Sequence, residues 1–223
     1  MSRSYQELIE QAKVNIELWR GDIQNRGTAA MTMAPNGTPR FGRIGNKQYL
    51  MTFTSTDKIV SNAAITPVIN PTTAFWIEVG IASRATDYFV YQVAGGGFGA
   101  YQDVTAGNLL FILLTFTATG GAARYTNSFA GTAGYPLQPY HAIGYIDPVG
   151  LSGQWWINGV ITGTSFVNLA PPVAGGNAVL YVGGSAGPGV NTSLCRVWQG
   201  TPDTNEVQVL YNAYSTLRVP RKV

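Results

Sequence analysis

Apolar and polar residues alternate in several short runs of the chain, which is the pattern of β-strands that bury one face. In the clearest run, every second residue from Phe75 to Ile81 is large and apolar, and the residues between them are Trp, Glu and Gly. Residues 88–93, 109–117 and 142–146 form further β-like runs, separated by glycine-rich turns. The pattern predicts an all-β domain built from many short strands.

One of these runs lacks the alternation. Residues 109–114 read Leu-Leu-Phe-Ile-Leu-Leu, so both faces of this strand are apolar. Such a strand is expected either in the centre of a sandwich or beneath a protein partner. The pattern alone leaves both alternatives open.

A hairpin is predicted around the Asn-Gly pair at 158–159. Asn and Gly tolerate the positive φ angles that a two-residue type I′ turn needs, so Ile157 is expected to pair with Val160. Because side chains alternate along a strand, Trp155 and Ile157 then share one face and Trp156 points to the other. We expect Trp155 in the core and Trp156 on the outside.

The chain opens with a short amphipathic helix. Residues 4–7 read Ser-Tyr-Gln-Glu, which fits a capping box, and apolar residues follow at helical spacing. The helix is predicted over Tyr5–Lys13, and it is too short to be stable alone in water. Its apolar face must therefore dock on the chain's own sandwich or on another subunit, through Tyr5, Leu8 and Ile9.

A second helix is predicted near the other end of the chain. Thr201 offers an N-cap, Pro202 suits the first helical position, and apolar residues recur at helical spacing as far as Tyr214. The predicted organisation is a docking arm over residues 1–14, a β-sandwich over 15–216 and a basic tail over 217–223.

Composition agrees with a single β-rich domain. The 223 residues are 45% hydrophobic and only 11% charged, and they include 27 glycines. The net charge is +3, and the 14 Lys and Arg residues are dispersed rather than grouped, which disfavours nucleic acid as a partner. Cys195 is the only cysteine, so no intramolecular disulfide can form. The first residues lack the apolar segment of a signal peptide, and no apolar run is long enough to cross a bilayer, so we expect synthesis in a cytoplasm and no membrane partner.

Several segments occur in the order found in one structural superfamily. The segments are residues 15–19, 48–53, 141–147, 153–162 and 195–198, with the Asn-Gly hairpin as the most specific of them. Together they resemble the laminin-G-like, concanavalin-A-like jelly rolls. The resemblance implies a two-sheet antiparallel jelly-roll sandwich with a short N-terminal and a short C-terminal helix. It does not imply one function, because the superfamily includes lectins, glycosidases, adhesins and structural modules.

Catalytic signatures are weak. Glycoside hydrolysis needs two carboxyl groups a short distance apart, and no central strand carries the close acidic spacing of such enzymes; Glu78 stands alone in its strand. Residues 183–187 match G-x-S-x-G, but Pro188 follows where a nucleophile elbow requires a helix. His141 is the only histidine, and no metal or other cofactor site is predicted. Calcium binding, which some members of the superfamily show, stays open because backbone carbonyl ligands leave no trace in a sequence.

Aromatic residues are the remaining candidates for binding. Outward aromatic rings suit sugars or a protein partner, and they are plentiful here: Tyr88, Tyr91, Tyr101, Tyr125, Tyr135, Tyr140, Tyr145 and Trp156. The resemblance implies a ligand face bordered by Trp156, Asn158, Tyr145 and Asp147.

Three functions remain as hypotheses. The first is a non-catalytic structural or assembly protein, a decoration, cement or fibre protein on a phage or virus particle that forms a homo-oligomer with other subunits. The second is a carbohydrate-binding lectin or adhesion module, and the first two are compatible with each other. The third, a glycoside hydrolase, lacks the carboxylate pair.

Overall fold

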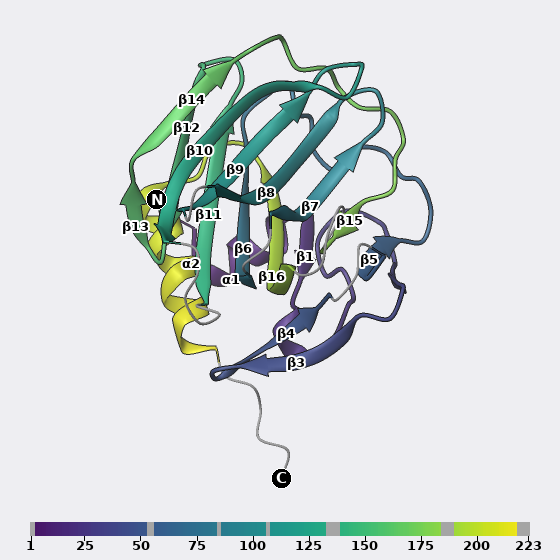
Figure 1. The fold of residues 1–223 in the computed structure, drawn as a ribbon, viewed down its shortest axis with the longest axis vertical. Helices are drawn as coiled ribbons and strands as arrows, with labels where there is room; N and C mark the ends of the chain where they lie inside the picture. The colour runs from purple at the N-terminus through teal and green to yellow at the C-terminus, as the bar shows by residue number, and fades with distance from the viewer. Residues whose placement is uncertain are drawn as a thin grey trace.

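The computed structural model describes residues 3–52, 56–83, 86–105, 108–132, 139–183 and 190–217, and these residues form two antiparallel sheets packed face to face (Figure 1). Two short α-helices accompany the sheets. The prediction of an all-β, two-sheet antiparallel sandwich with a short helix near each end is confirmed.

The first sheet carries both α-helices on its outer face, and we call it the helix-covered sheet. Its strands run in the order β13-β12-β11-β6-β16-β4-β3, and β1 also pairs with β16. The bounds are β1 (Val14–Ile16), β3 (Arg40–Ile44), β4 (Lys47–Met51), β6 (Phe75–Ser83), β11 (Tyr140–Asp147), β12 (Ser152–Ile157), β13 (Val160–Thr162) and β16 (Val190–Gln199).

The second sheet carries a group of tyrosines on its outer face, and we call it the tyrosine sheet. Its strands run in the order β14-β10-β9-β8-β7-β15-β5-β2. The bounds are β2 (Met33–Asn36), β5 (Lys58–Ser61), β7 (Asp87–Val93), β8 (Gly97–Thr105), β9 (Asn108–Phe116), β10 (Ala122–Thr132), β14 (Thr164–Asn168) and β15 (Tyr181–Val182).

The main core lies between the two sheets. The alternating residues of β6 line it as predicted, and the inward residues of β9 meet them from the tyrosine sheet. These core residues, all but one fully buried, are Phe75, Ile77, Val79, Ile81, Leu109, Phe111 and Leu113. Burial of these apolar side chains is the principal term that holds the two sheets together.

The predicted hairpin joins β12 to β13. Ile157 pairs with Val160, and Asn158 and Gly159 have φ angles of 52° and 79°. Trp155 is fully buried in the core between the sheets. The turn type and register predicted for this hairpin are confirmed.

Helix α1 (Tyr5–Gln11) begins with the predicted capping box, in which Ser4 accepts from the backbone N–H of Glu7. It ends two residues earlier than predicted. The backbone N–H of Lys13 donates to the carbonyl of Val197 at 2.8 Å, because the chain leaves the helix to enter β1 beside β16. The backbone at Lys13 thus joins the sheet instead of forming a last turn of the helix.

Helix α2 (Thr204–Thr216) begins two residues later than predicted. Its N-cap is Asp203 rather than Thr201, and the Asp203 carboxylate accepts from the N–H of Asn205 at 2.7 Å. Glu206 completes a second capping box by accepting from the N–H of Asp203 at 2.9 Å. A carboxylate cap with a returning glutamate satisfies more of the free N–H groups than Thr201 could at this site.

Both helices close over a second apolar cluster on the outer face of the helix-covered sheet. Leu8 of α1 is fully buried in this cluster, together with Val207 and Leu210 of α2. Tyr5 packs against the same cluster, and Ile9 is partly buried. The apolar face of α1 therefore docks on its own sandwich through Tyr5 and Leu8, which is the first of the two alternatives that the sequence left open.

A buried ion network lies beneath α1. Arg196, 1% exposed, donates to Glu78 at 2.9 Å and to Glu17 at 2.7 Å. It also donates to the hydroxyl of Tyr5 at 2.9 Å, and His141 lies 2.8 Å from the other oxygen of Glu78. The network therefore joins β16, β6, β11 and the residue that follows β1 to helix α1, which covers them.

The pKa of Glu78 reflects this environment. Complete burial alone would raise the pKa, but the charge of Arg196 and the hydrogen bond with His141 outweigh burial and hold it below the ordinary value. Glu78 is therefore ionised and paired.

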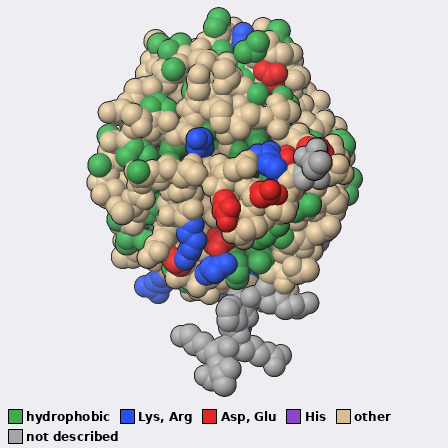
Figure 2. Space-filling view, turned by 180° about the vertical axis from the view of Figure 1, so that it is seen from behind, with side chains coloured by type: hydrophobic (Ala, Val, Ile, Leu, Met, Phe, Trp, Pro, Cys, Tyr) green, Lys and Arg blue, Asp and Glu red, His purple; other side chains and the backbone are tan. Residues whose placement is uncertain are grey.

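The side of the molecule opposite to the view of Figure 1 mixes the two signs of charge. Acidic and basic side chains lie next to one another in the lower half of that view (Figure 2). No described helix has the length and apolarity that a membrane span requires. The predicted tail lies outside the described residues apart from Leu217, and so does most of the G-x-S-x-G segment, including Ser185.

We predict that Arg196→Met lowers the free energy of unfolding by about 3–5 kcal/mol, because the fully buried Glu78 loses its arginine partner and Glu17 keeps only Arg20. Arg3→Met is the matched control, since Arg3 also pairs with a glutamate, Glu206, but its side chain is 29% exposed. The control is expected to cost about 1 kcal/mol or less. Urea unfolding followed by tryptophan fluorescence measures both; equal losses would show that burial of the network carries no special weight.

Candidate functional site

Trp156 does not lie on an open surface. It points away from the core between the sheets, as predicted, but it is only 7% exposed because it belongs to the cluster beneath α1 and α2. Trp76 and Trp198 stack beside it, with ring centroids 4.0 Å apart. The expectation that Trp156 meets a ligand is corrected: alternation predicted its side of the strand, and the helices cover that side.

The other residues of the predicted ligand face serve local structure. The Asn158 side chain accepts from the backbone N–H of His141 at 2.9 Å, at the start of β11. Asp147 ends the same strand and accepts from the N–H groups of the following turn, 3.0 Å and 2.9 Å away. Tyr145 is partly buried against the tryptophan cluster. The structure thus separates Asn158 and Asp147 along β11 instead of grouping them.

The outer face of the tyrosine sheet gathers aromatic side chains from four strands. Each of these tyrosines is partly exposed, and they share one face because they occupy alternate or paired positions in neighbouring strands. We call this surface the tyrosine face; its rings are Tyr88, Tyr91, Tyr101, Tyr125 and Tyr181.

Four rings of the tyrosine face contact one another in a row. The centroids of Tyr181 and Tyr91 lie 4.5 Å apart in a stacked pair, and Tyr91 and Tyr88 lie 5.1 Å apart. Tyr88 and Tyr101, which are paired across β7 and β8, are also 5.1 Å apart. These separations are those of favourable aromatic pairs, so each ring helps to fix the next.

An apolar floor lies under and beside these rings. The outward residues of β9, Ile112 and Leu114, are 7% and 3% exposed and form one cluster with Phe116, against which Tyr88, Tyr101 and Tyr125 pack. A Cβ atom at Gly99 would lie 2.8 Å from the ring of Tyr88, so the missing side chain lets that ring lie flat against the sheet. The non-alternating run 109–114 therefore serves both faces, with one half in the core and the other half in this floor.

Few charges border the tyrosine face. The ammonium group of Lys58 lies 5.1 Å from the ring centroid of Tyr181, in range of a cation–π contact. Asp103, at the far end of β8, accepts from the hydroxyl of Thr86 at 3.0 Å. Burial raises the pKa of Tyr101 to about 12, with smaller contributions from Tyr88 and Asp103. Tyr101 is thus a neutral phenol at any physiological pH.

Sequence reasoning identified most of these tyrosines as candidates but not their grouping. Tyr140, named with them, is buried against Phe111 in the core, with ring centroids 5.8 Å apart. Tyr135 lies outside the described residues. Tyr181 was missed because β15 is only two residues long and gives no periodic signal.

The carboxylates of the helix-covered sheet do not form an open acid pair. Glu78 and Glu17 accept hydrogen bonds from the same guanidinium, that of Arg196, and they are 0% and 2% exposed. Both pair with that guanidinium, and Glu17 also pairs with Arg20 at 2.6 Å. Because both carboxylates are buried, neither has the solvent access that glycoside hydrolysis requires. Among the described residues, no three His, Cys, Asp or Glu side chains gather as metal ligands would.

The fold and the tyrosine face define a lectin-like β-sandwich with an aromatic outer surface. No protein-family model matches the sequence, and no characterised protein matches it by sequence. Similarity appears instead among solved structures, which include several binding domains of bacterial toxins.

Three of these structures illustrate the likeness. The binding domain of Paraclostridial Mosquitocidal Protein 1 has a TM-score of 0.68 at 12% identity, over 94% of this chain and 53% of that one. The binding domain of botulinum neurotoxin serotype G has a TM-score of 0.67 at 11% identity, over 92% and 51%. The ligand-binding domain of botulinum neurotoxin serotype D, solved with N-acetylneuraminic acid, has a TM-score of 0.62 at 11% identity, over 92% and 51%. At these identities the likeness establishes the fold, and this chain spans about half the length of each structure.

We predict that the Tyr101 phenol titrates near pH 12. Because its pKa in the folded protein is above the ordinary value of 10.0, the neutral form stabilises the fold fully below pH 10, and this contribution is lost as the pH rises through the folded value. A titration of ring-labelled tyrosine by NMR measures it, with Tyr101→Phe assigning the signal. Asp103→Asn should lower the value; a Tyr101 signal that titrates at 10 would show that the ring is not desolvated.

Proposed function

We propose that this chain is a non-catalytic binding protein that holds carbohydrate on its tyrosine face, and that it belongs to the laminin-G-like, concanavalin-A-like group. The observation that carries the proposal is the group of five partly exposed tyrosines on one sheet face, four of which form a row of ring contacts. A pyranose ring offers C–H groups on its faces and hydroxyls at its rim. Tyrosine complements both, since its ring is apolar and its hydroxyl donates and accepts hydrogen bonds.

Rigidity favours binding at this face. Tyr88 and Tyr101 contact each other and pack on the floor formed by Ile112 and Leu114, so little of their side-chain freedom remains to be lost when a ligand binds. Tyrosine-rich surfaces in other binding proteins gain affinity in the same way, through large rigid contacts with few torsions. The face suits an uncharged stretch of a glycan, since its described rim carries few charges.

Similarity to toxin binding domains supports the proposal at the level of fold. One of those domains was solved with a sugar acid, N-acetylneuraminic acid. The two-sheet scaffold is therefore found in binding domains of other proteins.

We further propose that the chain is an accessory protein of a phage or virus particle, as a decoration, cement or fibre subunit. A disulfide-free sandwich with a low charge content suits a protein that is made in a host cytoplasm and released on lysis. Homo-oligomers on such a particle would multiply weak glycan contacts into strong attachment.

The double variant Tyr88→Ala/Tyr91→Ala is predicted to reduce glycan binding by about a hundredfold, because each aromatic anchor is worth about 1–2 kcal/mol. The measurement is a glycan array, followed by titration of the strongest ligand. Tyr91→Phe keeps the ring and removes one hydroxyl, so it should lose less.

Tyr145→Ala is the matched control, since Tyr145 lies on the outer face of the opposite sheet. It should retain binding, and all variants should show folded circular dichroism spectra. Absence of any array signal for the wild type, or equal losses in the control, would overturn the assignment of the tyrosine face.

The particle role predicts that the chain sediments with intact particles. Lysates from infected cells would be separated on a density gradient and each fraction analysed by mass spectrometry. We expect the chain in the nucleic-acid-containing particle band in fixed ratio to a capsid or tail protein. A chain found only in the soluble fractions would contradict the particle role and leave the glycan proposal standing.

A further inference from the structure

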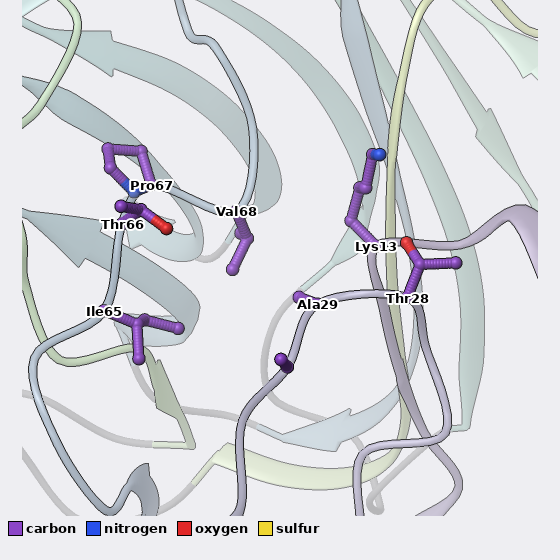
Figure 3. Close-up of a pocket in the computed structure, with 8 residues that line it drawn as sticks. Lys13, Thr28, Ala29, Ile65, Thr66, Pro67 and Val68 are labelled. Atoms are coloured by element: carbon purple, nitrogen blue, oxygen red, sulfur yellow. The ribbon is translucent and has the colours of Figure 1, made fainter.

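A small pocket opens at the edge of the sandwich, away from the rings of the tyrosine face. Lys13, Thr28 and Ala29 form one wall, residues 65–68 form the other, and the two walls face each other across the gap (Figure 3). The pocket has a volume of about 250 Å³, the space of a single sugar ring.

Backbone hydrogen bonds fix both walls. On one side, the N–H of Thr28 donates to Ala12 at 2.8 Å and the N–H of Ala29 donates to Lys13 at 2.9 Å. On the other side, Ile65 and Ala178 exchange two bonds of 3.0 Å. The pocket is therefore formed before any ligand arrives.

A buried glutamine supports the second wall. Gln92 of β7 is 2% exposed, and its side-chain oxygen accepts from the N–H of Val68 at 2.9 Å. Its amide nitrogen donates to the carbonyls of Ala178 at 3.1 Å and Ile65 at 3.3 Å. With a further contact to the carbonyl of Thr66 at 3.4 Å, this one buried amide bonds to three residues of the loop 65–68 and fixes its position.

The lining combines a cation, two hydroxyls and an apolar wall. The Lys13 ammonium group is exposed and has no ion pair or hydrogen bond with another described residue, and the same holds for the hydroxyls of Thr28 and Thr66. Ile65, Pro67 and Val68 supply the apolar wall, and none of the described residues that line the pocket is aromatic.

We propose that this pocket binds a sugar acid, with the ligand's carboxylate on Lys13. Its ring hydroxyls would bond to Thr28 and Thr66, and its C–H face would rest on the apolar wall. An ammonium group beside free hydroxyls favours an anion that also carries hydroxyls, whereas a planar base would find no ring to stack on.

A second hollow of about 430 Å³ adjoins the pocket and shares Lys13 and Thr28 with it. It leaves room for the next sugar of a chain. Glu10 lines this second hollow rather than the pocket, where its side chain accepts from Gln6 at 2.6 Å. The cation in the pocket is thus left for the ligand.

The choice of a sugar as ligand rests on the glycan-binding function proposed above, but the pocket shares no side chain with the tyrosine face. The test uses D-glucuronate, D-glucose and acetate as probes, with amide chemical shifts of the labelled full chain as the readout. We expect D-glucuronate to shift the backbone amides of residues 13, 28, 29, 65, 66 and 68, and to bind about tenfold or more tightly than either other probe.

Lys13→Gln should weaken D-glucuronate binding by about tenfold, the usual effect of losing one charged hydrogen bond. Thr66→Val, which keeps the side-chain shape, should weaken it severalfold. Lys58→Gln, at the rim of the tyrosine face, and Tyr88→Ala/Tyr91→Ala should both leave it unchanged.

Equal binding of glucose and glucuronate, equal binding of acetate, or full binding by Lys13→Gln would each overturn the proposal. Binding to the pocket with no signal on the glycan array would contradict the tyrosine face alone. The reverse result would contradict the pocket alone.

Discussion

The burial of one guanidinium group determines how the two sides of this sandwich differ. Arg196 lies between the helix-covered sheet and α1, where an unpaired charge would be very costly. Its partners, Glu78, Glu17 and Tyr5, come from β6, from the end of β1 and from the helix itself. Because each of them must be in place for the charge to be satisfied, the network ties α1 to the sheet more strictly than apolar contact would.

Helices α1 and α2 cover the aromatic cluster on the helix-covered sheet, so contacts with a ligand are expected on the tyrosine sheet. Stacked Trp76 and Trp198, with Trp156, would form a large aromatic surface if α1 and α2 were absent. The Trp198 indole N–H donates to the carbonyl of Leu8 at 2.8 Å, so even the polar edge of that surface is used to hold the helix. The tyrosine sheet, in contrast, presents a group of partly exposed rings to solvent.

Local signals in the sequence predicted local structure well. The Asn-Gly pair fixed a hairpin and its register, the capping box fixed the start of α1, and alternation fixed the core face of β6. What covers a strand's outer face is not a local property. Trp156 and Leu114 both point away from the core, but one lies under two helices and the other under tyrosines from three strands. In both cases the covering residues are distant in the sequence from the residue they cover. The candidate site could therefore be recognised only from the tertiary structure.

Strand β7 shows how one short segment supports two kinds of surface. Tyr91 and Gln92 are adjacent in sequence and point to opposite sides, as pleating requires. Tyr91 stacks outward on Tyr181, whereas Gln92 turns inward and holds the wall of the pocket through Val68. The strand pairs with β8 on one side and β15 on the other, which limits its movement. The two surfaces therefore share a rigid support and no contacting side chain, and for sites related in this way the energetic effects of substitutions are expected to add independently.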